Sequence, residues 1–274
     1  GVMSVGQLPS LFGSFAPLLF GGQSEPPLEG ETAWRSYFAS LCERVVDEAD
    51  EIAAVVVEPI VLGVAGMRMY APELLADLRA ACDRADTFLI ADEVFTGFGR
   101  TGRRFASEGE GLVPDLLCVG KALGGGLPIS ACLGRAEVMA AWGDPDREAI
   151  HTGTFFGNPV SCAAALAALD ILDHSDTLAR VREEGEALGN RLRLWARNQE
   201  RPLSVSGRGM LWGLTFPSAA DALRTMVGLL DHGYITLTAG TKGNVLQIVP
   251  PFFIERERLI AFEEVLDRIV QGLP

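Results

Sequence analysis

The chain has 274 residues, of which 48% are hydrophobic, and it carries a formal net charge of −13 at pH 7. This length and apolar content predict a globular protein with one large domain or two unequal ones. The acidic balance and the lack of a Lys/Arg cluster argue against a nucleic-acid partner. No apolar run reaches the roughly 18 to 20 residues of a membrane span, so no membrane partner is expected.

The cysteines form no CxxC pair and show no spacing typical of metal ligands, so no metal site is expected. Their neighbours are apolar or alanine-rich, which predicts reduced core thiols in an intracellular, cytoplasmic protein. The five cysteines are Cys42, Cys82, Cys118, Cys132 and Cys162.

Helix and strand patterns alternate along the first 135 residues. Helical spacing predicts helices over 34–49 and 71–85, the second with Pro72 in its first turn. The strands expected between and after them cover 52–61, 87–94, 116–123 and 129–135. The β-branched run at 52–61 is typical of a strand buried on both faces. This alternation predicts an α/β fold with a mostly parallel sheet covered by helices.

Two long helices follow, over 158–172 with Asn158 as the cap and over 176–200. Beyond Arg201 the pattern changes to strands near 203–216, 234–240 and 245–251, with helices near 218–231 and from about 255. We therefore expect residues 1–200 to form part of a large cofactor-binding α/β domain. Residues 201–274 are expected to form a small C-terminal α+β domain.

Polar residues follow three of the expected strands: Glu58, Asp92 and Lys121. Open α/β sheets bind ligands at the carboxyl ends of their strands. Each residue alone has an ordinary interpretation, since Glu58 can cap a loop, Lys121 can be solvated and Asp92 can pair with Arg100. Together they are more specific, because a lysine beside a buried carboxylate and followed by "GGG" matches the needs of a pyridoxal phosphate site.

In such a site the lysine forms a Schiff base with the cofactor aldehyde, and a carboxylate keeps the ring nitrogen protonated. A cationic ring would explain why Asp92 is buried. Glu93 should point to the opposite side of the strand. We expect Glu93 to be structural and to pair with a loop donor such as Arg100.

The segments "EPI", "LIADEVFTGFGRTG", "PDLLCVGKALGGGLP", "HTGTFFGNPVSCAAALAAL" and "GRGMLWGL" resemble the class III aminotransferases in order and spacing. This group of fold type I enzymes includes ornithine, acetylornithine and 4-aminobutyrate aminotransferases. The resemblance covers nearly the whole chain. It implies pyridoxal phosphate as cofactor and transfer of an amino group from an amino acid or amine to a 2-oxo acid or aldehyde.

The resemblance also implies residue roles. Asp92 would contact the ring nitrogen, Val94 would pack on one ring face, and Lys121 would form the Schiff base. Thr154 would reach the cofactor phosphate of the neighbouring subunit, which implies a homodimer with shared sites. His151 is expected to be a structural neighbour of that loop.

Three positions depart from the family pattern. Many relatives carry a glutamine where this chain has Phe95. The ornithine, acetylornithine and 4-aminobutyrate enzymes carry a glutamate and an arginine where this chain has Val64 and Gln247. Losing both members of an ion pair avoids leaving one buried charge unpaired. We therefore do not expect ornithine or acetylornithine as the substrate.

Family members begin with a phosphate-binding loop and an aromatic-His-Gly motif that this chain lacks, and the chain begins with Gly1. We expect a fragment, or one half of a split enzyme whose N-terminal part is supplied elsewhere. Two alternatives stay open. The chain can be a non-catalytic partner subunit that retains the fold, or an aminomutase or racemase, which shares the lysine and the aspartate.

Overall fold

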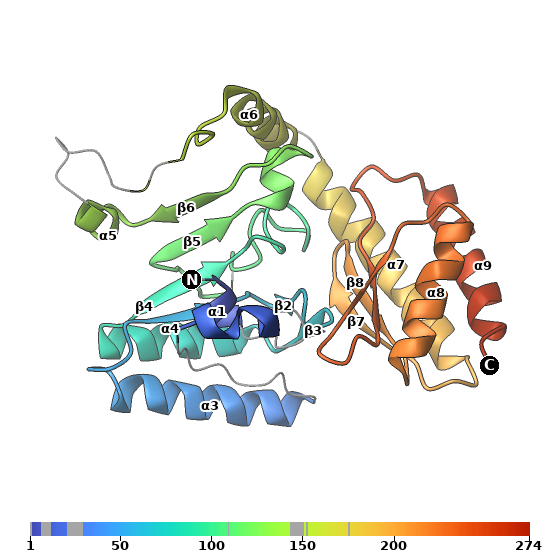
Figure 1. The fold of residues 1–274 in the computed structure, drawn as a ribbon, viewed down its shortest axis with the longest axis horizontal. Coiled ribbons are helices and arrows are strands. Elements are labelled where there is room, and N and C mark those ends of the chain that lie inside the picture. The colour runs from blue at the N-terminus through green and yellow to red at the C-terminus, as the bar shows by residue number, and fades with distance from the viewer. Residues whose placement is uncertain are drawn as a thin grey trace.

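The computed structural model describes residues 2–6, 12–20, 30–108, 110–142, 151, 153–174 and 176–274. It contains two four-stranded sheets that lie side by side, each with helices packed on it (Figure 1). Across these ranges, no helix combines the length and the apolar character that crossing a bilayer would require.

The first sheet has the strand order β1-β4-β5-β6. Strands β1 (Ala54–Val57), β4 (Phe88–Asp92) and β5 (Leu116–Val119) are parallel, and β6 (Ala131–Gly134) is antiparallel to β5. Helices α3 (Glu31–Asp47) and α4 (Glu73–Ala85) pack together and against this sheet through one hydrophobic core. The predicted α/β fold with a mostly parallel sheet is confirmed.

The expected strand over 52–61 is broken after β1. Pro59 has no backbone N–H, and Ile60 has φ 67°, which an extended strand does not allow. The chain then forms the ribbon of β2 (Val61–Leu62) and β3 (Arg68–Met69). Burial on both faces was also wrong, because Val56 is 43% exposed on the face opposite α4.

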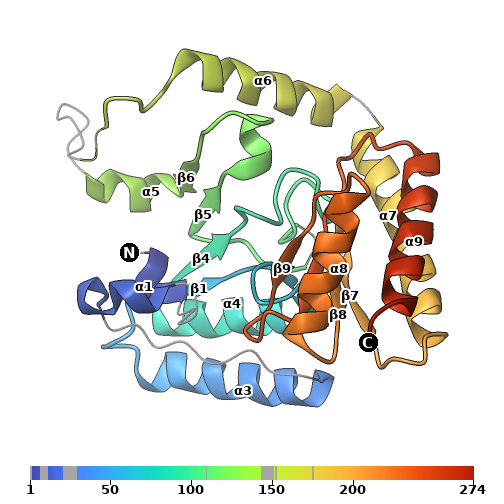
Figure 2. The same ribbon diagram turned by 45° about the vertical axis from the view of Figure 1, so that its right-hand side comes forward.

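Helix α6 (Pro159–His174) lies across the top of the first sheet (Figure 2). Asn158 caps it as predicted, because its Oδ1 accepts hydrogen bonds from the N–H groups of Val160 and Ser161 at 2.9 and 3.3 Å. The helix packs on the short η2 helix (Lys121–Gly124) through a small apolar cluster. The other short helices are α1 (Val2–Gly6), η1 (Gly13–Leu18), α5 (Ala136–Met139) and η3 (Ala140–Trp142).

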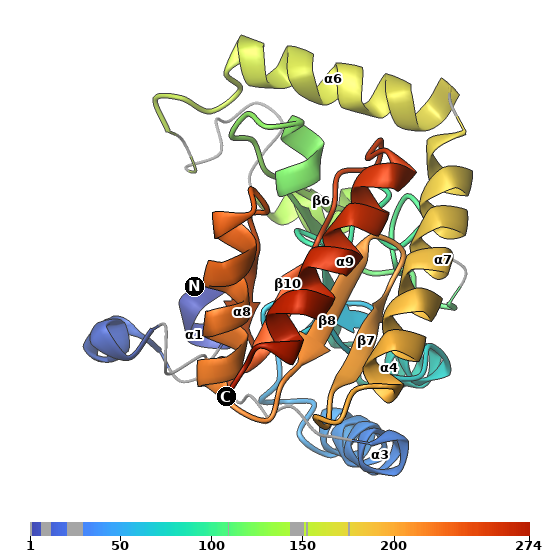
Figure 3. The ribbon, with the colours of Figure 1, turned by 90° about the vertical axis from the view of Figure 1, so that its right-hand side faces the viewer.

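The second sheet is antiparallel with the order β7-β8-β10-β9. Its strands are β7 (Ser204–Arg208), β8 (Leu211–Thr215), β9 (Leu237–Ala239) and β10 (Val245–Ile248). Helices α7 (Thr177–Arg197), α8 (Ala219–Asp231) and α9 (Arg256–Gln271) pack on its outer side, away from the first sheet (Figure 3). Helix α7 shares the hydrophobic core of this sheet. A domain division at residue 200 stays a proposal, and α7 packs with the part that follows it.

The loop after β4 is attached to the second sheet. The N–H of Met210 donates to the carbonyl of Arg100 at 2.8 Å, and Arg100 Nη1 donates to the carbonyl of Pro250 at 2.7 Å. The Arg100 guanidinium also lies 4.6 Å from the ring centroid of Phe252. The two sheets are therefore joined at the end of β4.

Candidate active site

Three polar residues meet at one edge of the first sheet. The register pairs Val57 with Ala91 and Asp92 with Cys118. Glu58 therefore lies beside Asp92, and Lys121 follows β5 on the next strand. Since β1, β4 and β5 are parallel, their carboxyl ends share this edge. The three strand-end residues identified in the sequence come together as expected.

Lys121 has an unusual backbone and a largely unpaired amine. Its φ is 44°, a left-handed conformation that residues other than glycine seldom adopt and that is common at functional sites. Partial burial lowers the pKa of Lys121, while the charges of Glu58 and Asp92 oppose this effect. Within the described part of the chain, Nζ makes no hydrogen bond or ion pair, and it lies over the ring of Phe95.

Asp92 and Val94 lie beside this lysine. Asp92 Oδ1 accepts a hydrogen bond from the N–H of Val94 at 3.1 Å. The Val94 side chain lies 3.6 Å from the position that a Cβ would take at Gly120. Asp92 is half-buried, and the expectation of a buried carboxylate was wrong because its face of the sheet is not covered by α3 or α4.

Glu93 is the buried carboxylate, with 0% exposure. Its oxygens accept hydrogen bonds from Thr96 Oγ1 at 2.7 Å, from the Ala106 N–H at 2.9 Å, and from the N–H and Oγ of Ser107, both at 2.8 Å. Four donors offset the cost of burying this charge. Glu93 is structural, as expected, but the predicted partner Arg100 was wrong, since that side chain is bound to the second sheet.

Glu58 accepts a hydrogen bond on Oε2 from the N–H of Gly63 at 2.9 Å. Burial raises the pKa of Glu58 to about 7; the Gly63 N–H and Lys121 oppose the shift, and Asp92 adds to it. This carboxyl therefore titrates near neutral pH. The sequence located Glu58 at a strand end but gave no sign of its ionisation, which depends on three-dimensional burial.

Tyr70 fixes the backbone around Glu58 and was missed by sequence reasoning. Its hydroxyl donates to the Glu58 carbonyl at 2.6 Å and accepts from the Ile60 N–H at 3.1 Å. The ring is buried against Trp34 and Phe38, with centroids 5.5 and 5.0 Å away. Tyr70 lies in no motif, and the only available signal was the break in the strand that it supports.

Val64 and Gln247 lie where the two sheets meet. The Val64 carbonyl accepts a hydrogen bond from the Gly240 N–H at 3.0 Å. Gln247 is paired in register with Gly213, where an added Cβ would lie 2.8 Å from the carbonyl oxygen of Gly66. The turn that carries Val64 therefore packs on the strands that carry Gln247. Both positions are uncharged.

Thr154 is exposed in a turn ahead of α6, whereas the other candidate residues lie at strand ends. Its neighbours Phe155 and Phe156 are 82% and 64% exposed. The ring of His151 lies 5.5 Å from that of Phe156, centroid to centroid. This turn presents Thr154 and two aromatic rings on the surface.

The cysteines differ in exposure. Cys82 is buried, whereas Cys132 is exposed, so the expectation of core thiols was wrong there because β6 is an edge strand. Cys118 is paired in register with Cys132. Burial, Cys132 and Asp92 raise the pKa of Cys118 to about 11. Among the described residues, no group of His, Cys, Asp and Glu side chains is arranged to hold a metal ion.

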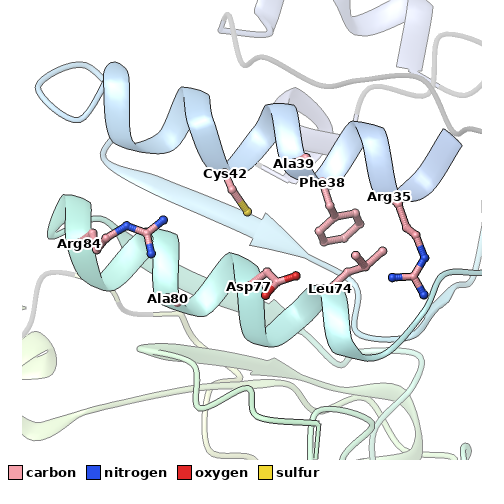
Figure 4. A pocket seen from close by; sticks show the side chains of 8 residues that line it. All are labelled: Arg35, Phe38, Ala39, Cys42, Leu74, Asp77, Ala80 and Arg84. Atoms are coloured by element: carbon pink, nitrogen blue, oxygen red, sulfur yellow. The ribbon is translucent and has the colours of Figure 1, made fainter. Parts of the chain in front are cut away.

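A pocket of about 360 Å³ lies elsewhere, between α3 and α4 (Figure 4). It is lined by Arg35, Phe38, Ala39, Cys42, Leu74, Asp77, Ala80 and Arg84. It belongs to the outer helical layer and includes none of the strand-end residues. The convergence of lysine and carboxylates therefore locates the candidate site better than this pocket does.

The sequence model for class III aminotransferases matches residues 16–271. The chain belongs to the class III aminotransferase family. It is 38% identical over 229 residues to a 4-aminobutyrate aminotransferase of Mycobacterium leprae, a match that covers 81% of this chain and 50% of that protein. It is 35% identical over 257 residues to an acetylornithine aminotransferase of Neisseria meningitidis, covering 93% and 60%. The resemblance inferred from the motifs is confirmed.

The solved structures agree with this assignment. An adenosylmethionine-8-amino-7-oxononanoate aminotransferase from Methanocaldococcus jannaschii matches with a TM-score of 0.85 and 29% identity, covering 96% of this chain and 63% of that one. The chain has the fold of its family, which is fold type I of the pyridoxal-phosphate enzymes. It spans between half and two thirds of the length of these three relatives.

Proposed function

We propose that this chain is part of a pyridoxal-phosphate-dependent aminotransferase in which Lys121 binds the cofactor covalently. One observation carries the proposal: a lysine with a lowered pKa and no ion-pair partner in the described residues lies beside the half-buried carboxylate of Asp92. A lysine nucleophile reacts as the free amine, and a lowered pKa increases the fraction of that form. Family membership supports the same chemistry.

The residues present fit the cofactor. Asp92 uses Oδ1 to accept from Val94, and in the described part of the chain its Oδ2 accepts no hydrogen bond, so Oδ2 is free for a protonated ring nitrogen. Val94 would contact a ring face. Gly125 and Gly126 follow Lys121 with φ 56° and 112° and have open space where a side chain would be. Open backbone beside the lysine allows close approach of a ligand.

Bound pyridoxal phosphate withdraws electrons from the carbon that carries the substrate amino group. When the substrate amine takes its place on the cofactor, the freed Lys121 amine would move the proton, as a general base and then a general acid. Asp92 keeps the ring nitrogen protonated through a charge-assisted hydrogen bond. Glu58, with a pKa near 7, holds or releases a proton beside this pair at neutral pH.

A homodimer with shared sites is part of the proposal. Thr154 would contact the cofactor phosphate of the neighbouring subunit, and the exposed Phe155 and Phe156 beside it are suited to a subunit interface. The substrates would be an amino acid or amine and a carbonyl acceptor. The uncharged Val64 and Gln247 support a substrate other than ornithine or acetylornithine. The free thiols support a cytoplasmic location.

Reductive labelling tests the proposal directly, because Lys121 and Lys242 are the only lysines in the sequence. The chain is saturated with pyridoxal phosphate, reduced with borohydride, digested and mapped by mass spectrometry. We expect the label on Lys121, retained in Lys242→Arg and lost in Lys121→Arg. A label on Lys242 alone, or no label, would contradict the proposal.

Amino-group transfer is then measured over a panel of amino acids and amines with pyruvate or 2-oxoglutarate as acceptor. A transaminase requires the acceptor in stoichiometric amount. Product formation without any acceptor would indicate an aminomutase or racemase instead.

A further inference from the structure

The ring of Phe95 contacts both Lys121 and Gly63. Lys121 Nζ lies 4.2 Å from the ring centroid, within the range of a cation–π interaction. On the Gly63 side, an added Cβ would lie 2.1 Å from Cδ1 and 2.9 Å from Cε1 of the ring. Gly63 does not have a left-handed φ. Space for the Phe95 ring, and not backbone conformation, therefore requires glycine at position 63.

The same turn also holds Glu58, because the Gly63 N–H donates to Glu58 Oε2. Two ionisable groups act on Lys121, namely Glu58 directly after β1 and Asp92 at the end of β4. The α6 residues that pack toward η2, Ala165 and Leu172, are uncharged. The Phe95 ring thus lies against the amine, with no competing hydrogen bond or ion pair in the described part of the chain.

We propose that Phe95 is a positioning residue for Lys121, whose ring face holds the lysine side chain over the carboxyl ends of β4 and β5. Its importance for catalysis rests on the proposed function, but its contact with the lysine does not. The ring attracts the ammonium form and not the free amine. It therefore opposes the effect of partial burial and keeps the ammonium form directed to one place.

Competitive labelling with acetic anhydride tests this contact without added cofactor. The acetylation of Lys121 and Lys242 is followed by peptide mass spectrometry across a pH series that spans the titration of both amines. In Phe95→Leu, we expect a lower pKa for Lys121 and a rise in its free-amine fraction of about two- to fivefold, the effect of an exposed or half-exposed cation–π contact. Lys242 is the internal reference and should not change.

Phe95→Tyr retains an aromatic face, so in this variant Lys121 should titrate as it does in the wild type. A role in packing alone would not distinguish leucine from tyrosine in this way. If Lys121 titrates identically in wild type and Phe95→Leu, with circular dichroism unchanged, the proposal is overturned.

Gly63→Ala provides a second route if Phe95→Leu is unstable. Its Cβ displaces the ring, so Lys121 should shift in the same direction as in Phe95→Leu. In the double variant the ring is already absent, so the two shifts should not add. Additive shifts, or no shift in Gly63→Ala, would refute the contact. Reductive labelling that failed at Lys121 would instead refute the cofactor assignment and leave this titration result standing.

Discussion

Glu58 makes the stability of the fold depend on pH. Its pKa is about 7 in the folded chain against an ordinary value of 4.5. A raised carboxyl pKa contributes stability that is fully present below 4.5 and is lost as the pH rises through about 7. Glu58→Gln removes this loss. We expect the variant to exceed wild type in unfolding free energy by up to roughly 3 kcal/mol above pH 7, with the two converging at acidic pH.

Urea denaturation over a pH series measures this difference. Glu51→Gln is the control, because Glu51 is exposed in the turn before β1 and should behave like wild type throughout. Parallel pH profiles for Glu58→Gln and wild type would show that Glu58 is not buried in its neutral form.

Asp92 and Glu93 show how far residue-level prediction reaches. Alternation along a strand separates the two side chains, and that part follows from the sequence. Which of them is buried depends on which face the helices cover. Three of the four donors to Glu93 come from Ala106 and Ser107, thirteen and fourteen residues later, in a loop that carries no recognisable motif. The wrong partner, Arg100, was the basic residue nearest in sequence.

Helix α7 packs closely on the second sheet at two of its glycines. A Cβ at Gly185 would lie 2.3 Å from the carbonyl oxygen of Gly209, and one at Gly189 would lie 2.1 Å from the Trp212 ring. The first of these contacts involves backbone, which cannot move without shifting the β7–β8 turn. These glycines allow the helix and the sheet to pack at close range.

We therefore expect Gly185→Ala to destabilise the fold by roughly 2–3 kcal/mol, as an overpacked contact does. Helix propensity alone would make the same change stabilising by about 1 kcal/mol. Gly228→Ala on α8 is the matched control, because its Cβ would meet only the Ile269 side chain at 3.1 Å. Chemical denaturation compares the variants, and a stability gain in Gly185→Ala would exclude this packing.

At the scale of elements, local patterns predicted most helices and strands. Helix α3, helix α9 and the Asn158 cap agree with the expected positions because apolar spacing and caps are local signals. The run at 52–61 did not form one strand, since Ile60 adopts a backbone that β-branched residues avoid. No spacing pattern indicated that α7 packs in the second core, because any amphipathic helix fits either sheet.

Several large apolar side chains stay on the surface of the whole molecule. Phe155, Val160 and Leu166 are 82%, 65% and 64% exposed around the start of α6, and Leu133 on β6 is 50% exposed. Exposed apolar patches commonly mark interaction surfaces. We expect the chain to self-associate as its concentration rises.

Sedimentation velocity over a concentration series tests this expectation. Phe155→Ser combined with Leu166→Ser should shift the chain toward monomer. Ile235→Ser is the control, because Ile235 is 86% exposed next to the second sheet and away from α6. A chain that is monomeric at every concentration, or an equal response to the control, would contradict the assignment of this surface.

The attachment of Arg100 to the second sheet has a consequence for truncation. Phe95 precedes Arg100 in this loop, and the Glu93 donors Ala106 and Ser107 follow it. The Arg100 carbonyl and guanidinium are bound by Met210 and Pro250. A chain cut near residue 200 would lose both bonds and the surface on which this loop rests. The last quarter of the sequence contributes no strand-end residue, yet it is needed to shape the end of β4. The proposed division at residue 200 would also cut between α7 and the core that α7 shares with the second sheet, so we expect a chain shortened there to lose the site.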